Sequence, residues 1–307
     1  MKAIIFGCGY WGQKIISSLE RIDNVEIVGL CDINENISKK YPEIPYFKSY
    51  EDINIEYDCA FIITRISSHF NLARKCLEDR KHVFLEKPMT ESYDDAKNLI
   101  KLAKKAGKIL CVDHTFVFSH EIEYFKSIFN KDCSYLELKR VNNGPRVDDL
   151  NVIFDLCPHD FSILDYIIPY KINGVSANGI STVNGVAEKA NITVYYKDTN
   201  FKANIEVSWL ETDKLRRIRL LKNNLDNLVY DNNDDFISFY NLDSKESKKI
   251  SIERKESLFV ELKHFVDCIN NNKKSEYIDG QRGADIVKLL EITNESIRNN
   301  GKFIQLK

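Results

Sequence analysis

The first candidate functional motif, indicated by the spacing of its glycines, is the turn Gly7-Cys8-Gly9-Tyr10-Trp11-Gly12. This turn follows an apolar segment and opens a segment whose apolar residues recur at helical spacing. Gly7 permits a tight bend, Gly9 lets the backbone approach a pyrophosphate, and Gly12 lets helix and strand pack closely. The amide groups at the helix start then receive the phosphates. We therefore predict a dinucleotide site; the alternative is a structural turn that holds no ligand.

An acidic residue, Asp32, ends the next apolar segment, twenty positions after Gly12. A carboxylate there accepts hydrogen bonds from the adenine-ribose hydroxyls and repels a 2′-phosphate. Ile33 and Asn34 follow it, so no Arg or Lys is present there to pair with a 2′-phosphate. We therefore predict NAD(H) as the cofactor in preference to NADP(H); the alternative for Asp32 is a helix cap.

The second candidate is Glu86-Lys87-Pro88, which directly follows the short apolar run His82–Leu85. This position is the carboxyl edge of a strand, where ligand and cofactor meet. Lys87 can place a positive charge or a proton beside a developing alkoxide, and Glu86 can hold the lysine in place. A cis Lys87-Pro88 bond would aim the lysine inward. The alternative is a lysine exposed to solvent.

The third candidate is Asp155-Leu156-Cys157-Pro158-His159-Asp160. Pro158 suits the position just before a helix, so we expect a helix near His159–Ile168. Histidine titrates near neutral pH, as a general base for a sugar hydroxyl must. Asp155 could orient its imidazole. The alternative is that these residues cap or pack a helix.

The elements that must position these residues alternate between strand and helix over residues 1–115. The strand-like segments are apolar throughout, which is typical of a parallel sheet covered by helices on both faces. This doubly wound α/β architecture binds ligands at the carboxyl ends of its strands. The expected strands are Lys2–Phe6, Val25–Cys31, Asp58–Thr64, His82–Leu85 and Lys108–Val112. The expected helices are Tyr10–Arg21, Ser68–Asp79 and Ser92–Ala106.

Residues 116–307 predict a second domain of the α+β class. Strand follows strand from Gly174 to Ile252, which indicates a large, mostly antiparallel open sheet. Two helices close the chain, and we expect the last, Gly280–Asn299, to pack back towards the first domain. Alternating apolar residues at Ile205, Val207 and Trp209 suggest a sheet face that a second subunit covers. We therefore expect a homodimer or homotetramer through the C-terminal sheet.

Composition and charge argue against several classes of function. The net charge is -2, so no overall basic field attracts nucleic acid or a membrane surface. No apolar run approaches the roughly 20 residues of a membrane span, and the N-terminus carries no secretory leader pattern. The eight cysteines lack a C-x-x-C spacing, so we expect reduced, buried thiols, no metal site and a cytoplasmic protein.

Taken together, these motifs resemble the Gfo/Idh/MocA oxidoreductases, the family of glucose–fructose oxidoreductase and inositol dehydrogenase. The resemblance covers nearly the whole chain in order, and it implies a Rossmann domain over residues 1–115 followed by a domain for substrate binding and oligomerisation. It implies that Lys87, Asp155 and His159 are catalytic and surround the carbon that exchanges hydride with the nicotinamide. The implied cofactor-binding residues are Gly7, Gly9, Tyr10, Trp11, Gly12, Asp32, Thr64, Arg65, His69, Glu86 and Lys87.

One departure from the family pattern is Thr64-Arg65, where the family usually has Thr-Pro. Proline fixes the loop beneath the cofactor, whereas Arg65 could reach a phosphate. His69 follows in the familiar place, and it could cap the next helix or contact the cofactor.

Within the family, the segments Val112–Phe116 and Asp149–Asp160 are similar to those of enzymes that act on nucleotide-linked sugars, such as UDP-N-acetyl-glucosaminuronate 3-dehydrogenases. This similarity implies oxidation or reduction of a ring carbon, C3, in sugar biosynthesis. The implied substrate-binding residues are Lys87, His114, Arg146, Asn151 and His159. Arg146, and also Lys139 or Arg140, could supply charge for a phosphate or carboxylate. Alternatives are a dehydrogenase of a free sugar or cyclitol, and a non-catalytic NAD(H)-dependent sensor or scaffold.

Overall fold

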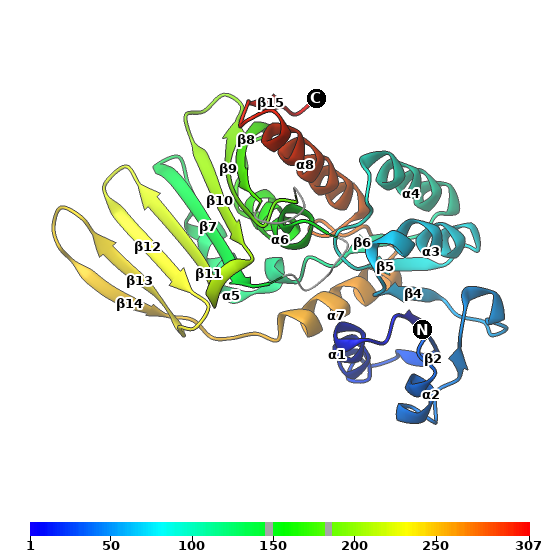
Figure 1. Cartoon of the computed structure of the whole chain (residues 1–307). Coiled ribbons are helices and arrows are strands. Elements are labelled where there is room, and N and C mark those ends of the chain that lie inside the picture. Colours follow the sequence, from blue (N-terminus) through cyan, green and yellow to red (C-terminus); the bar gives the residue numbers. More distant parts are fainter. Residues whose placement is uncertain (145–149, 182–185) are drawn as a thin grey trace. The chain divides into compact units, whose positions relative to one another are not determined.

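The computed structural model describes residues 1–144, 150–181 and 186–307 (Figure 1). The chain forms two compact units. The first comprises Met1–Thr115 and Glu256–Val287, and the second comprises Phe116–Lys255 and Lys288–Lys307.

The first unit contains a six-stranded sheet in the order β3-β2-β1-β4-β5-β6, with every neighbouring pair parallel. Its central strands are buried along nearly their whole length, because helices cover both faces. The strands are β1 (Lys2–Phe6), β2 (Glu26–Cys31), β3 (Tyr46–Phe47), β4 (Cys59–Ile62), β5 (His82–Leu85) and β6 (Leu110–Val112). The doubly wound α/β prediction is confirmed.

The helices of this unit are divided between the two sheet faces. One face packs on α3 (Ile66–Glu78), α4 (Tyr93–Ala106) and the first turns of α8 (Gly280–Arg298). On the other face α7 (Ser257–Asn270) places Phe265 against two strand residues, Phe61 and Phe84, with ring centroids 5.4 Å from each. Helix α1 (Tyr10–Leu19) packs against α7, and α2 (Asn36–Lys40) follows β2.

The second unit contains a nine-stranded sheet in the order β14-β13-β12-β11-β7-β10-β9-β8-β15. All neighbouring pairs are antiparallel except β7 and β10, so the prediction of a mostly antiparallel sheet is confirmed. The strands are β7 (Cys133–Asn143), β8 (Ile172–Ile180), β9 (Lys189–Tyr196), β10 (Lys202–Ser208), β11 (Leu210–Lys222), β12 (Asp226–Asp231), β13 (Phe236–Asn241), β14 (Ser247–Ser251) and β15 (Ile304–Gln305). The helices are α5 (His120–Ile128), α6 (Val152–Ile167) and the end of α8.

Helix α6 begins seven residues earlier than the sequence predicted. Asn151 caps it by accepting a hydrogen bond from the Phe154 amide at 3.0 Å, and Pro158 lies inside the helix. The prediction that Pro158 precedes the helix is wrong, because the asparagine cap and the burial of α6 outweigh the single backbone hydrogen bond that a proline removes. As a result, Asp155 and His159 lie one turn apart on the same face of one helix.

The apolar residues Ile205, Val207 and Trp209 are buried within the chain, with at most 5% of each exposed. Helix α6 covers β10, so this sheet face is occupied inside one molecule. The inference that these three residues form a surface for a second subunit is therefore wrong; their alternation marks the face beneath α6.

No helix in the described part of the chain is long and apolar enough to cross a membrane. All eight cysteines are buried and unbridged.

Candidate active site

The glycine turn is built as the dinucleotide motif requires. Gly7 has φ +87°, and a Cβ added there would lie 2.4 Å from the Ile63 carbonyl oxygen. A Cβ added to Gly12 would lie 2.1 Å from the Gly7 carbonyl oxygen, so only glycine allows this approach of helix to strand. Gly9 caps α1, and nothing lies within 4 Å of its added Cβ. The backbone at Gly9 is thus open to a ligand at the helix start.

Asp32 is tied directly to this turn. Its Oδ2 accepts a hydrogen bond from the Cys8 amide at 2.6 Å, and its Oδ1 accepts one from the Asn34 amide at 2.8 Å. A carboxylate has about four acceptor positions, so both oxygens can still accept from ribose hydroxyls. The next side chain, Ile33, is 87% exposed. The Asp32 carboxylate therefore lies against the glycine turn with acceptor positions to spare.

Two other cofactor-side candidates flank the turn. Tyr10 is exposed, and Lys14 Nζ lies 4.7 Å from the centre of its ring. Trp11 donates a hydrogen bond from Nε1 to Asp113 Oδ2 at 2.9 Å. The Tyr10 ring is therefore available at the surface, whereas the Trp11 ring is anchored to Asp113.

His69 lies between two segments that the sequence placed in the site. Its Nδ1 is 2.9 Å from the Pro88 carbonyl oxygen, and its Nε2 is 3.1 Å from the Thr64 carbonyl oxygen. The ring is fully buried, and burial lowers its pKa. Because both nitrogens face backbone carbonyls, this position supports a structural role that holds the Thr64 loop against the Lys87-Pro88 turn.

Thr64 and Arg65 form the loop before α3. Thr64 Oγ1 accepts a hydrogen bond from Ser68 at 2.7 Å, and Arg65 is the N-cap residue of the helix with extended backbone angles. The extended conformation that proline would impose is thus adopted by arginine.

Lys87 follows β5 at the carboxyl edge of the sheet, and the peptide bond that joins it to Pro88 is cis. Glu86 precedes it and continues the strand pairing, because its amide donates to the Ile62 carbonyl oxygen at 2.9 Å. The charge of Lys87 acts on Asp113 and His114, which directly follow β6. Lys87, Asp113 and His114 therefore form one electrostatic group.

The His114 ring is 1% exposed, and in the described part of the chain neither of its nitrogens has a hydrogen-bond partner. Burial, together with the charges of Lys87 and Arg282, lowers its pKa to about 3. The ring is therefore neutral, with one donor and one acceptor. Buried polar atoms are nearly always paired, so an unpaired imidazole indicates a ligand that completes it.

In the second unit, Asp155 and His159 project from consecutive turns of α6. Asp155 is buried, and its Oδ2 accepts a hydrogen bond from Trp209 Nε1 at 3.1 Å. The His159 ring packs edge-on against Phe116, with centroids 4.9 Å apart, and its Nδ1 is buried. Asn151, a predicted substrate-binding residue, is the cap of the same helix and donates from Nδ2 to Asn294 Oδ1 at 3.1 Å.

A cationic cluster beside His159 was only partly predicted. Arg140 Nε donates to both carboxylate oxygens of Asp160 at 3.1 Å, in a pair that is nearly fully buried. Arg216 stands directly opposite Arg140 across β7 and β11. The two guanidinium carbons lie 4.5 and 4.9 Å from the centre of the Phe116 ring. The alternation of Leu136, Leu138 and Arg140 along β7 could have indicated an inward-facing arginine, whereas nothing local indicated Arg216.

Arg146, another predicted substrate-binding residue, lies outside the described residues. The described residues contain no group of three or more His, Cys, Asp or Glu side chains that could hold a metal ion.

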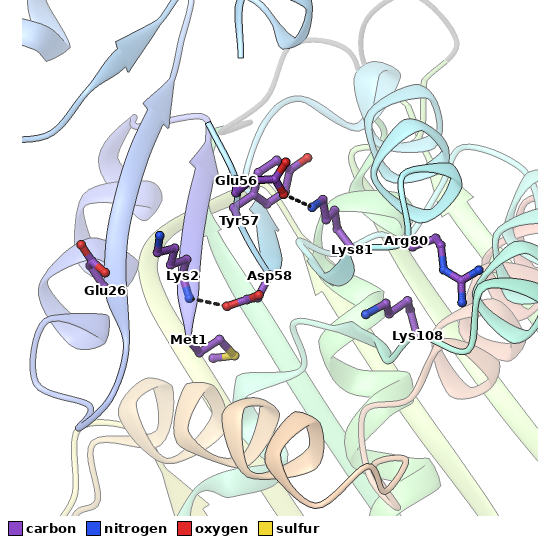
Figure 2. A pocket seen from close by; sticks show the side chains of 9 residues that line it. All are labelled: Met1, Lys2, Glu26, Glu56, Tyr57, Asp58, Arg80, Lys81 and Lys108. Atoms are coloured by element: carbon purple, nitrogen blue, oxygen red, sulfur yellow. Dashed lines mark hydrogen bonds and ion pairs between the residues drawn. The ribbon is translucent and has the colours of Figure 1, made fainter. Parts of the chain in front are cut away.

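A separate hollow of about 520 Å³ lies at the amino edge of the parallel sheet (Figure 2). Its lining carries both signs of charge, and some of these groups pair with one another, as Lys81 does with Glu56. Parallel strands begin at this edge and end at the other, so the hollow is distinct from the glycine turn, Asp32 and Lys87. The lining residues are Met1, Lys2, Glu26, Glu56, Tyr57, Asp58, Arg80, Lys81 and Lys108.

Comparison with known proteins gives a family match over the N-terminal segment of the first unit. Residues 1–114 match the Gfo/Idh/MocA family model, described as an oxidoreductase family with an NAD-binding Rossmann fold. A UDP-N-acetylglucosamine 3-dehydrogenase from Acidithiobacillus ferrooxidans is 26% identical over 224 residues, which make up 72% of this chain and 71% of that relative. A myo-inositol 2-dehydrogenase from Thermotoga maritima is 25% identical over 207 residues, or 62% of this chain and 61% of the relative.

Solved structures extend the likeness of fold to the whole chain. The structure of the Acidithiobacillus ferrooxidans UDP-N-acetylglucosamine 3-dehydrogenase matches with a TM-score of 0.88 at 21% identity, covering 98% of this chain and 99% of that one. An oxidoreductase from Agrobacterium radiobacter, solved in complex with NAD+, L-tartaric acid and magnesium, matches with a TM-score of 0.84 at 16% identity, covering 99% and 98% of the two chains.

Proposed function

We propose that this chain is a member of the Gfo/Idh/MocA family of oxidoreductases, whose model matches residues 1–114, and that it is an NAD(H)-dependent dehydrogenase of a ring carbon in a nucleotide-linked sugar. The observation that carries the proposal is that Asp155 and His159 stand one turn apart on α6, with the Asp155 carboxylate held by Trp209. A non-catalytic protein would have no need of this pairing.

The glycine turn fits a dinucleotide, because Gly9 leaves the start of α1 open and Gly7 and Gly12 allow no side chain. When bound, the nicotinamide would supply or accept the hydride. Gly9 and the first amides of α1 would hold the pyrophosphate, and Asp32 would hold the adenine ribose. His69 would keep the Thr64 loop and the Lys87 turn in register.

The protein's own side chains would transfer the proton of the reacting hydroxyl and stabilise the charge on its oxygen. His159 Nδ1 is buried, so Nε2 is the nitrogen that would take the proton in oxidation and return it in reduction. Asp155, itself fixed by Trp209, would orient the imidazole. Lys87 would stabilise negative charge on the substrate oxygen, and the neutral His114 ring would hydrogen-bond to the sugar.

We expect the wild-type protein to bind NADH roughly 100-fold more tightly than NADPH, because like charges placed together cost several kcal/mol. Replacing Asp32 with Asn keeps an acceptor for the Cys8 amide but removes the charge, so this variant should bind the two cofactors with similar affinity. Adding Ile33→Arg should then favour NADPH. Fluorescence titration with each cofactor measures this, and tighter binding of NADPH by the wild type would refute the role of Asp32.

A substrate with an anionic group is supported by the cluster beside His159. The guanidinium groups of Arg140 and Arg216 both lie against Phe116, whose ring contacts His159. Arg140 pairs with Asp160, and the charge of Arg216 also acts on that carboxylate, so two guanidinium groups and one carboxylate give the cluster a net positive charge that would favour a phosphate or carboxylate. The Acidithiobacillus relative is named for a UDP-sugar, which carries such phosphates.

Replacing Arg216 with Gln should raise the KM for a UDP-sugar by roughly tenfold, the size expected for one charge-assisted hydrogen bond. Arg217 provides a matched control, because it is adjacent on β11 but points to the other sheet face and pairs with Asp231. Arg217→Gln should leave the KM unchanged. Steady-state kinetics on UDP-sugars and on free sugars or cyclitols separates the hypotheses: equal effects of both variants, or efficient turnover of neutral sugars alone, would exclude the nucleotide-linked substrate.

We further propose that the chain forms a homodimer or homotetramer through the sheet of the second unit. The face opposite α6 supports this, because its charged side chains form a network of Lys139, Glu206 and Lys189 that is already only about a quarter exposed in one chain. Light scattering after size-exclusion chromatography would give the mass of the assembly.

A further inference from the structure

The indole of Trp11 links the dinucleotide turn to a residue far along the chain. Its Nε1 donates to Asp113 Oδ2 at 2.9 Å, across a separation of 102 residues. Trp11 stands in the first turn of α1, and Asp113 directly follows β6. The position of the turn therefore depends on what holds Asp113.

Asp113 is 2% exposed and is hydrogen-bonded to a second buried carboxyl group, Glu261 of α7. The Asp113 oxygens receive two N–H donors, from Trp11 and from the Thr115 amide at 3.2 Å. Glu261 is fully buried, and its Oε1 receives the His114 amide at 2.7 Å. Its Oε2 is buried with no N–H donor directed at it in the described part of the chain.

Two adjacent buried carboxyl groups do not both ionise, because the charges repel in a low dielectric. Burial raises the pKa of Asp113, but the hydrogen bonds from Trp11 and the Thr115 amide and the charge of Lys87 oppose that rise. Burial and the charge of Asp113 outweigh the Thr115 hydroxyl, which lowers the pKa of Glu261. Glu261 therefore carries the proton in the hydrogen bond that joins the two carboxyl groups. Burial raises the pKa of Glu261 well above its ordinary value, and the charge of Asp113 raises it further.

Other titratable groups surround the pair. His114 follows Asp113 and is itself acted on by Lys87 and by Arg282 of α8. Cys111 of β6 faces Glu261, Asp279 and Cys268. Burial raises the pKa of Cys111 and lowers that of His114, so both stay neutral near pH 7. Among these groups, the proton shared by Asp113 and Glu261 is therefore the one whose binding changes with pH.

We propose that Glu261 is a positioning residue that acts as a protonated acid and, through Asp113, fixes Trp11 in the cofactor turn. Its part in cofactor binding rests on the proposed dinucleotide site, while the link from Glu261 to Trp11 does not. Ionisation of Glu261 in alkali would place two negative charges together and release the indole. Because the native pKa is raised, the stabilisation is fully present below the unfolded value near 4.5 and is lost as pH rises through the native value.

The chain has two tryptophans, so Trp209→Phe leaves Trp11 as the sole indole reporter. In this background without cofactor, Trp11 emission should change in a single alkaline transition. Adding Glu261→Gln should abolish the transition, because the amide donates to Asp113 and accepts from the His114 amide at every pH. The same transition in the Gln variant would overturn the proposal.

NADH titration provides the second readout. Glu261→Leu should weaken NADH binding by roughly tenfold, the loss of one hydrogen bond to a charged group, whereas Glu261→Gln should stay within about twofold at pH 7. Asp267→Asn on the same helix is the control and should change neither signal. Equal NADH affinity in the Leu and Gln variants would also overturn the proposal. If no variant binds NADH, the proposed function fails, and the Trp11 transition still tests the acid pair.

Discussion

Replacing Lys87 with Met is expected to lower kcat by roughly 10²–10³-fold, the loss typical of removing one group that stabilises developing charge. Methionine keeps the length and apolar stem of lysine but carries no charge, so the cis turn and its contacts with His69 should persist. NADH affinity should therefore change little. Initial rates with the preferred nucleotide sugar, combined with NADH titration, measure both quantities.

The pKa of His114 provides an independent check on the Lys87→Met variant. The charge of Lys87 contributes to the low pKa of that ring, so its removal should raise the pKa of His114, which NMR titration can follow. Lys81→Met, at the amino edge of the same sheet, is the matched control and should retain full activity. A near-normal kcat in Lys87→Met together with a raised His114 pKa would show that Lys87 belongs to the electrostatic group with Asp113 and His114 but takes no part in catalysis.

Replacing His159 with Asn should lower kcat by roughly 10²–10⁴-fold, the range for loss of a general base. Asparagine preserves a polar side chain in α6 but cannot exchange a proton near neutral pH. The pH dependence of the residual rate should flatten, because the titrating base is absent. NADH binding should be unaffected, since the cofactor residues belong to the first unit.

Two controls separate a catalytic loss from a structural one. His82→Asn removes an imidazole at the amino edge of the parallel sheet and should leave turnover unchanged. Circular dichroism of His159→Asn should match the wild type. A His159 variant that retains wild-type kcat and an unchanged pH profile would contradict its role as the base.

Much of the first unit could be predicted, because its signals are local. The glycine turn, the apolar strands and Asp32 each depend on residues close in sequence, and steric contacts such as the approach of Gly12 to Gly7 leave little choice of residue. The boundary of α6 was missed because Pro158 is a strong local signal, whereas the cap at Asn151 and the burial of the helix decide the outcome.

The remaining features depend on tertiary contacts that no spacing reveals. Ile205 and Val207 alternate as a strand must, but only the position of α6 determines which face is covered. Glu261 lies 147 residues from the amide that it contacts at His114, and Arg216 reaches Phe116 only through strand pairing with β7. Such contacts between distant residues are consequences of the tertiary fold.

The central claim, hydride exchange with a sugar ring carbon, is tested most directly by isotope transfer. NADH carrying deuterium at the transferable C4 position would be incubated with the protein and a panel of 3-keto and 4-keto UDP-sugars. We predict consumption of NADH and deuterium on a ring carbon of the product, detected by mass spectrometry and NMR. Bound NADH that keeps its deuterium with every sugar offered would contradict the account.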